Sequence, residues 1–179
     1  QLDFENLSES TCPKISFLKL EIDQIPETYK NSLDNYFSDL GLNKNNFFTD
    51  LSNYLSYETG QPTHCYDAST MSGKLLFHEI EKNEEFETLL DKKITLTGKN
   101  SVFSLNDNII NLAGIVGGKS KSCSQNTKTV IVECAFFQPE AIIGKSVKYD
   151  IQSEASHKFE RGVDPECHDK VLRRFIKLV

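Results

Sequence analysis

The sequence lacks features that mark several large classes of protein. Its five cysteines are an odd number and include no C-x-x-C pair, so neither a disulfide framework nor a zinc ribbon is predicted. No apolar run approaches the roughly 20 residues of a membrane span, and no stretch resembles a signal peptide. Basic residues are a minority, with 20 Lys and Arg against 26 Asp and Glu and a net charge of −6. These absences favour a cytoplasmic protein with reduced, buried thiols, and they argue against one that coats long duplex DNA. Contact with one short nucleic-acid end is still allowed.

The chain is long enough for one domain with a substantial core. It has 179 residues, of which 38% are hydrophobic. Residues 171–179 have the apolar spacing of a helix, and no Gly or Pro follows to end it. We therefore expect residues 1–179 to be a single module excised from a longer polypeptide; the alternative is a natural C-terminal helix.

Local patterns predict one strand, two helices, several short strands and then helices again. The predicted strands cover residues 15–22, 74–80, 93–97, 101–105, 109–116 and 128–136. One helix is expected to start at Pro26 and stop before Gly41, and a second to cover 47–58 before Gly60. After Pro139 the pattern is helical: Ser153 and Gly162 are expected to cap one helix, and Asp164 and Pro165 to begin the last. This order predicts an α+β domain with a mixed, mostly antiparallel sheet and flanking helices.

Residues 113–120, Ala-Gly-Ile-Val-Gly-Gly-Lys-Ser, nearly match a phosphate-binding loop. Such a loop must open a helix whose N-terminal amides face the phosphates. Here turn residues and then a strand follow, so an ATP site is not expected. A Gly-rich strand end, where backbone passes close to another group, fits better; an ordinary bulge or turn is the alternative.

Two residues stand out as candidates for chemistry. His64 follows the tight turn of Gly60-Gln61-Pro62, and Glu133 lies inside the apolar strand Val-Ile-Val-Glu-Cys-Ala-Phe-Phe. Strand alternation puts Glu133 on the same face as Ile131. A carboxylate there is costly unless it has a partner or a function. The alternative is an edge strand whose Glu133 faces water, which this stretch alone slightly favours.

Three stretches, taken together in their order along the chain, are specific enough to indicate a protein family. They are Asn53-Tyr54 with Gly60–Asp67, then Leu112–Gly118, and then Glu133–Pro139 with Ala155–Pro165. Together they resemble the editing module of the bacterial phenylalanyl-tRNA synthetase beta subunit, over about residues 30–179. The resemblance implies a layered β-β-α sandwich, in agreement with the α+β fold class.

The resemblance also implies a proofreading hydrolase that clears Tyr-tRNA(Phe) within an enzyme that ligates phenylalanine to tRNA(Phe). An apolar synthetic pocket cannot strongly reject a ligand that merely adds a hydroxyl, so a second site must correct the error. Glu133 matches the family's hydroxyl-sensing glutamate, and His64 matches the histidine near the aminoacyl ester. Further positions match residues that line the substrate pocket or set its size: Ser52, Asn53, Gly117, Ser153 and Ala155.

The implied mechanism is attack of water on the ester, without a covalent intermediate or a metal, and with His64 orienting or polarising the ester. Action of His64 as a general base is the alternative. No cofactor is expected in this domain, whereas the parent enzyme would use ATP and magnesium. The implied partners are the 3′ end of tRNA(Phe) and the alpha subunit of an α2β2 heterotetramer, with no membrane. Candidate phosphate contacts, for which solvated surface is the alternative, are Lys145, Lys148, Lys158 and Arg161.

The sequence departs from the family pattern at a few positions. Asn43-Lys44 stands where an Arg-Pro pair is common, Asp150 where glycine is common, and Ser153 replaces a commoner Thr. The first two departures motivate an alternative, a catalytically degenerate structural or tRNA-docking module of the same subunit. A free-standing deacylase of related fold is a further alternative.

Overall fold

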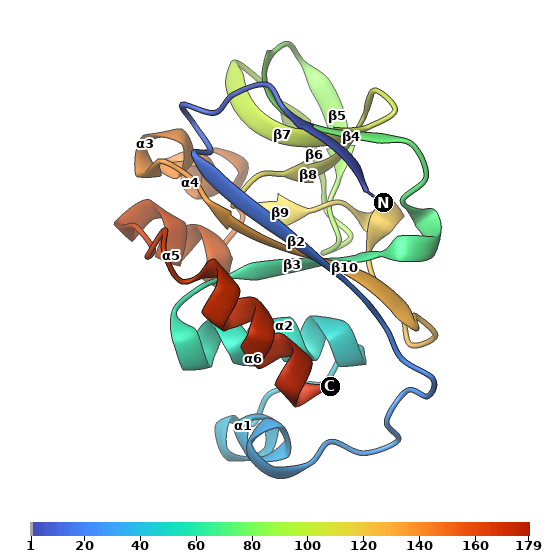
Figure 1. The fold of residues 1–179 in the computed structure, drawn as a ribbon. Helices are drawn as coiled ribbons and strands as arrows, with labels where there is room; N and C mark the ends of the chain where they lie inside the picture. Colours follow the sequence, from blue (N-terminus) through green and yellow to red (C-terminus); the bar gives the residue numbers. More distant parts are fainter. Residues whose placement is uncertain (1) are drawn as a thin grey trace.

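The computed structural model describes residues 2–179, which form two stacked sheets and a layer of helices (Figure 1). The first sheet has five strands in the order β1-β4-β7-β8-β9. Their bounds are Asp3–Asn6, Lys74–Glu81, Lys99–Leu105, Asn108–Leu112 and Val116–Gly117. β1 pairs with β4 in parallel and the other pairs of this sheet are antiparallel. A separate hairpin is formed by β5 (Glu84–Glu87) and β6 (Lys93–Leu96).

The second sheet has β10 (Thr129–Phe136) at its centre, between β2 (Lys14–Glu21) and β3 (Thr63–Asp67). Both pairings are antiparallel. Alternate residues of β10 enter different cores: Ile131 packs between the two sheets, whereas Val132 packs toward the helices. This single strand therefore belongs to both hydrophobic cores of the molecule.

Two helices, α2 (Phe47–Thr59) and α6 (His168–Leu178), cover the outer face of the second sheet, and α1 (Asn31–Leu40) packs against α2 on the side away from the sheet (Figure 1). The three helices share a core that includes Leu51 and Phe175. Three shorter helices, α3 (Pro139–Ile142), α4 (Lys145–Tyr149) and α5 (Glu154–Arg161), lie together at one side of the two sheets (Figure 1). They close the core between the sheets with Ile142, Tyr149 and Phe159. Two 3-10 turns, η1 (Ala68–Thr70) and η2 (Lys119–Lys121), complete the elements.

The structure confirms the predicted α+β class, the mixed and mostly antiparallel sheet, and the layered β-β-α arrangement. Gly41 and Gly60 end α1 and α2 in the left-handed conformation, with φ of 62° and 78°. Ser153 caps α5 by accepting a hydrogen bond from the Ser156 amide, and Gly162 follows the helix. Four of the five thiols are buried and all five are free, as the cysteine pattern predicts.

Two predicted helix starts are wrong. The helix expected from Pro26 begins only at Asn31: Lys30 before it is extended, and the Tyr29 hydroxyl bonds to Asp50 at 2.5 Å. The last helix begins at His168 rather than at Asp164. The Asp164 carboxylate instead accepts a hydrogen bond from the Glu166 amide, which makes a local turn.

The strand predictions also need correction. The strand expected over 109–116 is a tight hairpin, in which Gly114 turns the chain with a φ of +72° and β9 pairs back onto β8. The sequence did not predict β1, β3 or β5. The edge-strand interpretation of Glu133 is wrong, because β10 is the central strand of its sheet. Within residues 2–179, no helix has the length and apolarity that a membrane crossing requires.

Candidate functional site

Glu133 lies in the interior between the two sheets. It is only 5% exposed and faces the same core as Ile131, with Phe17 of β2 opposite it on one side and His64 of β3 on the other. No Lys or Arg among the described residues pairs with its carboxyl group. Burial raises the pKa of Glu133 to about 8, and a hydrogen bond from Tyr66 partly offsets this rise.

Tyr66 is the direct partner of Glu133. Its hydroxyl donates a hydrogen bond of 2.6 Å to Glu133 Oε2 and accepts one of 2.8 Å from Asn111 Nδ2 of β8. Tyr66 and Asn111 are 0% and 4% exposed. This chain of hydrogen bonds joins the first sheet to the second through the buried carboxyl group, where an unpaired polar group would be costly.

His64 is directly opposite Glu133 in the register of β3 and β10, so both side chains lie on one face of the sheet. Its ring meets the Tyr66 ring edge to face, with centroids 4.4 Å apart. His64 as a whole residue is partly exposed, and desolvation of its imidazole lowers the pKa to about 4. His64 is therefore neutral at pH 7. Its ring nitrogens make no hydrogen bond within residues 2–179, which leaves them free for a ligand.

The Gly-rich stretch is a strand end pressed against this site. A Cβ built on Gly117 would overlap the His64 ring and would lie 2.8 Å from Leu89 Cδ2. A Cβ on Gly118 would lie 2.6 Å from the Ile110 carbonyl oxygen. The three-residue 3-10 turn η2 follows. The stretch therefore does not open the α-helix that a phosphate loop requires, as the sequence predicts.

Among the other predicted pocket residues, Ser52 and Ser153 bond to residues that lie close to His64 and Gly117 in the chain. Ser52 of α2 is buried and bonds to the Thr63 carbonyl oxygen at 2.7 Å, one residue before His64. Asn53 is exposed on the same helix. Ser153 donates to the Ile115 carbonyl oxygen at 2.7 Å, two residues before Gly117, and Ala155 is partly buried against the core between the sheets.

The four predicted phosphate contacts are held by other parts of the chain. Lys158 donates to the Ser56 carbonyl and hydroxyl oxygens, both at 2.8 Å, and burial lowers its pKa. Lys148 and Lys145 donate to the carbonyl oxygens of Thr97 and Lys99, and Arg161 donates to that of His157. The three lysine contacts tie α4 and α5 to neighbouring elements, whereas the Arg161 contact lies within α5.

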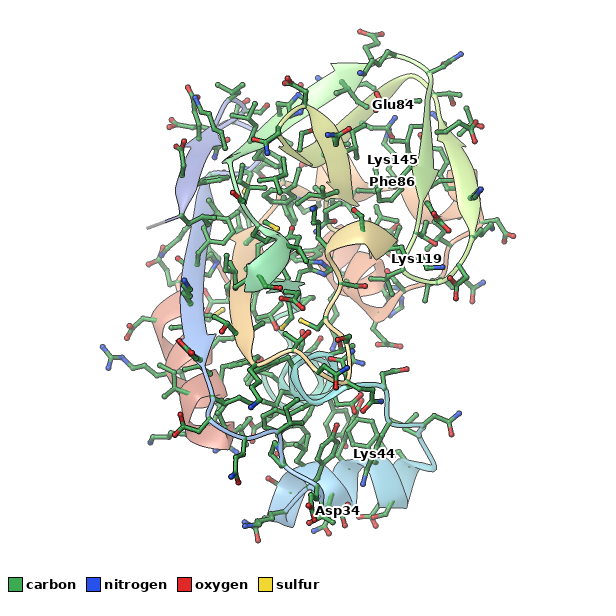
Figure 2. The ribbon with its side chains drawn as sticks, turned by 90° about the vertical axis from the view of Figure 1, so that its right-hand side faces the viewer. Asp34, Lys44, Glu84, Phe86, Lys119 and Lys145 are labelled. Atoms are coloured by element: carbon green, nitrogen blue, oxygen red, sulfur yellow. The ribbon has the colours of Figure 1, made fainter. Side chains whose placement is uncertain are left out.

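Neither Lys44 nor Asp150, two positions at which the sequence departs from the family pattern, bonds to His64 or Glu133. Lys44 bonds to Asp34 at 2.8 Å, and Figure 2 shows this pair at the α1 end of the molecule, far from Lys119 just after the Gly-rich stretch. Asp150 has a φ of +52°, which explains why glycine suits this position. Asp is among the residues that tolerate this conformation, and Lys92 bonds to the Asp150 carbonyl oxygen at 2.6 Å.

Sequence reasoning missed three residues of this site: Tyr66, Asn111 and Leu89. Tyr66 is two residues from His64, so the period-two rule would have placed both on one face if β3 had been predicted. Asn111 and Leu89 come from a different sheet and from the tip of the β5–β6 hairpin. No local pattern could have signalled their approach.

Two surface hollows, of about 320 and 350 Å³, lie elsewhere. The first is lined in part by Glu79, Lys99 and Lys145, and the second by Tyr29, Asp34 and Lys44. Neither includes His64 or Glu133. In the part of the chain that the structure describes, no three His, Cys, Asp or Glu side chains converge in the manner of metal ligands.

Comparison with known proteins connects this geometry to one family. The sequence model of the B3/4 domain matches residues 18–179. The phenylalanine–tRNA ligase beta subunits of Francisella tularensis and Psychrobacter arcticus are 34% and 36% identical over 139 residues, which are 78% of this chain and 18% and 17% of those proteins. The same subunit of Shewanella oneidensis is 38% identical over 131 residues, 73% of this chain and 16% of that protein.

The chain therefore spans less than a fifth of the length of these relatives. Among solved structures, an N-terminal fragment of the phenylalanyl-tRNA synthetase beta-subunit from Pyrococcus horikoshii is similar, with a TM-score of 0.54 and 11% identity. The similarity covers 79% of this chain and 45% of that one. At this identity the likeness shows a shared fold.

Proposed function

Since this chain belongs to the B3/4 domain family, we propose that it is the editing module of a phenylalanine–tRNA ligase beta subunit and hydrolyses mischarged Tyr-tRNA(Phe). One observation carries the proposal: a carboxyl group without a cationic partner is buried opposite His64, a partly exposed residue. Such a group is costly to maintain in a core unless a ligand uses it.

Glu133 would recognise the para-hydroxyl of tyrosine through a hydrogen bond. Phenylalanine has no group that could replace this bond, so its binding would leave a desolvated carboxyl oxygen unpaired. A site built to bond a hydroxyl rejects the analogue that lacks it far more strongly than an apolar pocket rejects an added hydroxyl. The editing site would thus supply the discrimination that a synthetic pocket for phenylalanine cannot.

His64 would act on the ester mainly by position. Water attacks the aminoacyl carbonyl carbon, the bond to the ribose oxygen breaks, and that oxygen leaves with a proton as the free hydroxyl. A general base works best when its pKa is near the operating pH, whereas the pKa of His64 is about 4. The neutral imidazole is therefore better suited to orienting the ester or the water by hydrogen bonds.

Gly117, Ser153 and Ala155 would shape the pocket, Gly117 by leaving room beside the His64 ring. Ser52 would support the start of β3 through Thr63, and Asn53 would offer a polar group near it. We place ATP- and magnesium-dependent charging outside these residues, in an assembly with the alpha subunit. The partner of this module is the 3′ end of tRNA(Phe).

The test uses the full-length beta subunit with its alpha subunit and pre-formed Tyr-tRNA(Phe). We expect the unaltered enzyme to release tyrosine faster than spontaneous hydrolysis and Glu133→Ala to reduce this release at least tenfold, in line with the loss of one buried hydrogen bond. Glu21→Ala is the matched control, because Glu21 is an exposed glutamate of the same sheet.

Unchanged tyrosine release by Glu133→Ala would contradict the role of Glu133. Release no faster than spontaneous hydrolysis by the unaltered enzyme would instead favour the alternative of a degenerate structural or tRNA-docking module. The two departures that motivated this alternative, Asn43-Lys44 and Asp150, contact neither His64 nor Glu133.

A further inference from the structure

The Tyr66 hydroxyl lies at the middle of the hydrogen-bond chain that reaches Glu133. It contacts Asn111 Nδ2 at 2.8 Å and Glu133 Oε2 at 2.6 Å, and the Tyr66 ring packs against His64. Tyr66 is completely buried. It therefore touches both of the residues that the proposed function uses, although it cannot itself reach a substrate through solvent.

The chemistry of these groups fixes the direction of each hydrogen bond. An amide nitrogen is a donor only, so the Tyr66 oxygen accepts from Asn111. A phenol has one proton, and Tyr66 must then donate it to Glu133 Oε2. Oε2 is thus committed as an acceptor. Oε1 makes no hydrogen bond to any residue from 2 to 179.

We propose that Tyr66 is a positioning residue that, with Asn111 behind it, occupies Glu133 Oε2 and leaves Oε1 as the one carboxyl oxygen available to the substrate's para-hydroxyl. This inference rests on the proposed function. The internal phenol and the substrate phenol would then bond to opposite oxygens of one carboxyl group. The backing from Asn111 prevents Tyr66 from turning its proton away.

The arrangement also explains how the site works in either protonation state of Glu133. With Oε2 accepting from Tyr66, any proton on the carboxyl group resides on Oε1. A phenol can donate to an ionised Oε1 or accept from a protonated one, whereas a plain phenyl ring can do neither. The charged form gives the stronger hydrogen bond. The KM for Tyr-tRNA(Phe) should therefore fall as pH rises through the pKa of Glu133.

Glu133 is the group of this cluster that titrates between pH 6 and 9. His64 is neutral there, with its pKa lowered to about 4, and burial raises the pKa of Tyr66 well above its usual value. The thiols of Cys12, Cys65 and Cys134 also have raised pKa values because they are buried. Asn111 and Phe17 do not ionise.

The test measures hydrolysis of Tyr-tRNA(Phe) by the full-length enzyme carrying Tyr66→Phe, as kcat and KM from pH 6 to 9. We expect KM to rise about tenfold, the effect of about one buried hydrogen bond, with kcat changed less than threefold. We also expect the pH at which KM falls to move upward, because the Tyr66 hydrogen bond lowers the pKa of Glu133.

Tyr149→Phe is the matched control. Tyr149 is also buried, and its hydroxyl bonds to Asn100 Oδ1 at 2.8 Å, but it does not contact Glu133. Tyr149→Phe removes a buried phenolic oxygen from the same domain, as Tyr66→Phe does, so a general loss of stability would affect both variants alike. We expect the KM and its pH profile in Tyr149→Phe to match those of the unaltered enzyme.

Asn111→Leu provides a second, independent variant of similar size, and it decides the question if Tyr66→Phe fails to fold. It should raise KM in the same direction, because Tyr66 is then free to turn its proton away. If Tyr66→Phe behaves like Tyr149→Phe, or if Asn111→Leu alone folds and leaves KM unchanged, the positioning role is wrong. Loss of activity in Glu133→Ala alongside such results would show that the proposed function stands without it.

Discussion

Glu133 has a phenol and an imidazole as its polar neighbours, and no cation. In the folded protein its carboxyl group therefore stays protonated at pH values at which the unfolded chain would carry it ionised, because in water a glutamate ionises near pH 4.5. The residue that we propose makes the site selective therefore also costs stability once it ionises. Under this proposal, function and stability are opposed at this one position, and the opposition depends on pH.

Glu133→Gln should remove a pH dependence of stability. The folded-state pKa of Glu133 is raised to about 8, so between roughly pH 4.5 and 8 the native state binds more protons than the unfolded state. Stability should therefore fall as pH rises through this window, by up to about 1.4 kcal/mol per pH unit. Urea unfolding of both proteins from pH 5 to 9 measures this. Parallel curves for the two proteins would contradict the raised pKa.

Gly117→Ala should impair hydrolysis more than it impairs folding. The added methyl group would push against the side chains of His64 and Leu89, which can move, but the imidazole would then leave its place. We expect at least a tenfold loss in kcat/KM for Tyr-tRNA(Phe), because misplacement by about 1 Å can cost that much or more. Gly41→Ala is the control: Gly41 ends α1 with a φ of +62° and has open space around it, so its methyl group strains only the backbone and should leave hydrolysis unchanged.

Retained hydrolysis in Gly117→Ala would show that His64 does not need its observed position. Gly118→Ala gives a useful contrast, because its methyl group would meet the Ile110 backbone instead. That variant should lose stability, whereas Gly117→Ala should melt close to the unaltered protein.

At the scale of elements, sequence patterns predicted the parts whose signals are local. The ends of α1 and α2 follow from glycines that alone accept the left-handed conformation easily, and the alternation of β10 follows from its run of apolar residues. The two wrong helix starts have different causes. Asp164 forms a local turn with Glu166, whereas Tyr29, just before α1, is held by a hydrogen bond to the distant Asp50.

The site itself was predictable only in part. His64, Glu133 and Gly117 could be named from motifs, and the structure brings these three together. Tyr66 and Asn111 could not, since their meeting depends on how two sheets stack, and stacking leaves no periodic signal in either strand. The burial of Glu133 likewise depends on strand order, which the sequence does not encode locally.

Ser153→Ala should destabilise α5 and the Gly-rich turn together. The Ser153 hydroxyl accepts from the Ser156 amide at 3.0 Å and donates to the Ile115 carbonyl oxygen. Loss of such a cap costs about 0.5–2 kcal/mol, and we expect the upper part of this range. Thermal melting of Ser153→Ala and Asp164→Ala compares a helix cap with an exposed turn residue. Equal melting temperatures for the two variants would contradict the role of Ser153.

At the scale of the whole molecule, β10 ties the two hydrophobic cores into one unit. Val132 and Phe175 belong to the core under the helices, and Ile131 belongs to the core between the sheets, where Glu133 also lies. Because one strand contributes to both, neither core should persist when the other is lost. The helix layer therefore supports the site although it lies on the opposite face of the sheet.

Phe175→Ala tests this coupling. Phe175 is 0% exposed and stacks on Phe48, so its truncation should cost about 3–5 kcal/mol. We expect amide hydrogen exchange to accelerate as much in β7, in the distant sheet, as in β10 and α6. Faster exchange confined to α2 and α6 would show instead that the two cores unfold separately.

The measurement that tests the central claim most directly is the ratio of kcat/KM for Tyr-tRNA(Phe) over Phe-tRNA(Phe), in the full-length enzyme with and without Glu133→Ala. If the buried carboxyl group detects the para-oxygen, the ratio is high in the unaltered enzyme and falls at least tenfold in the variant, chiefly through slower release of tyrosine. A ratio that is the same in both enzymes would contradict the account.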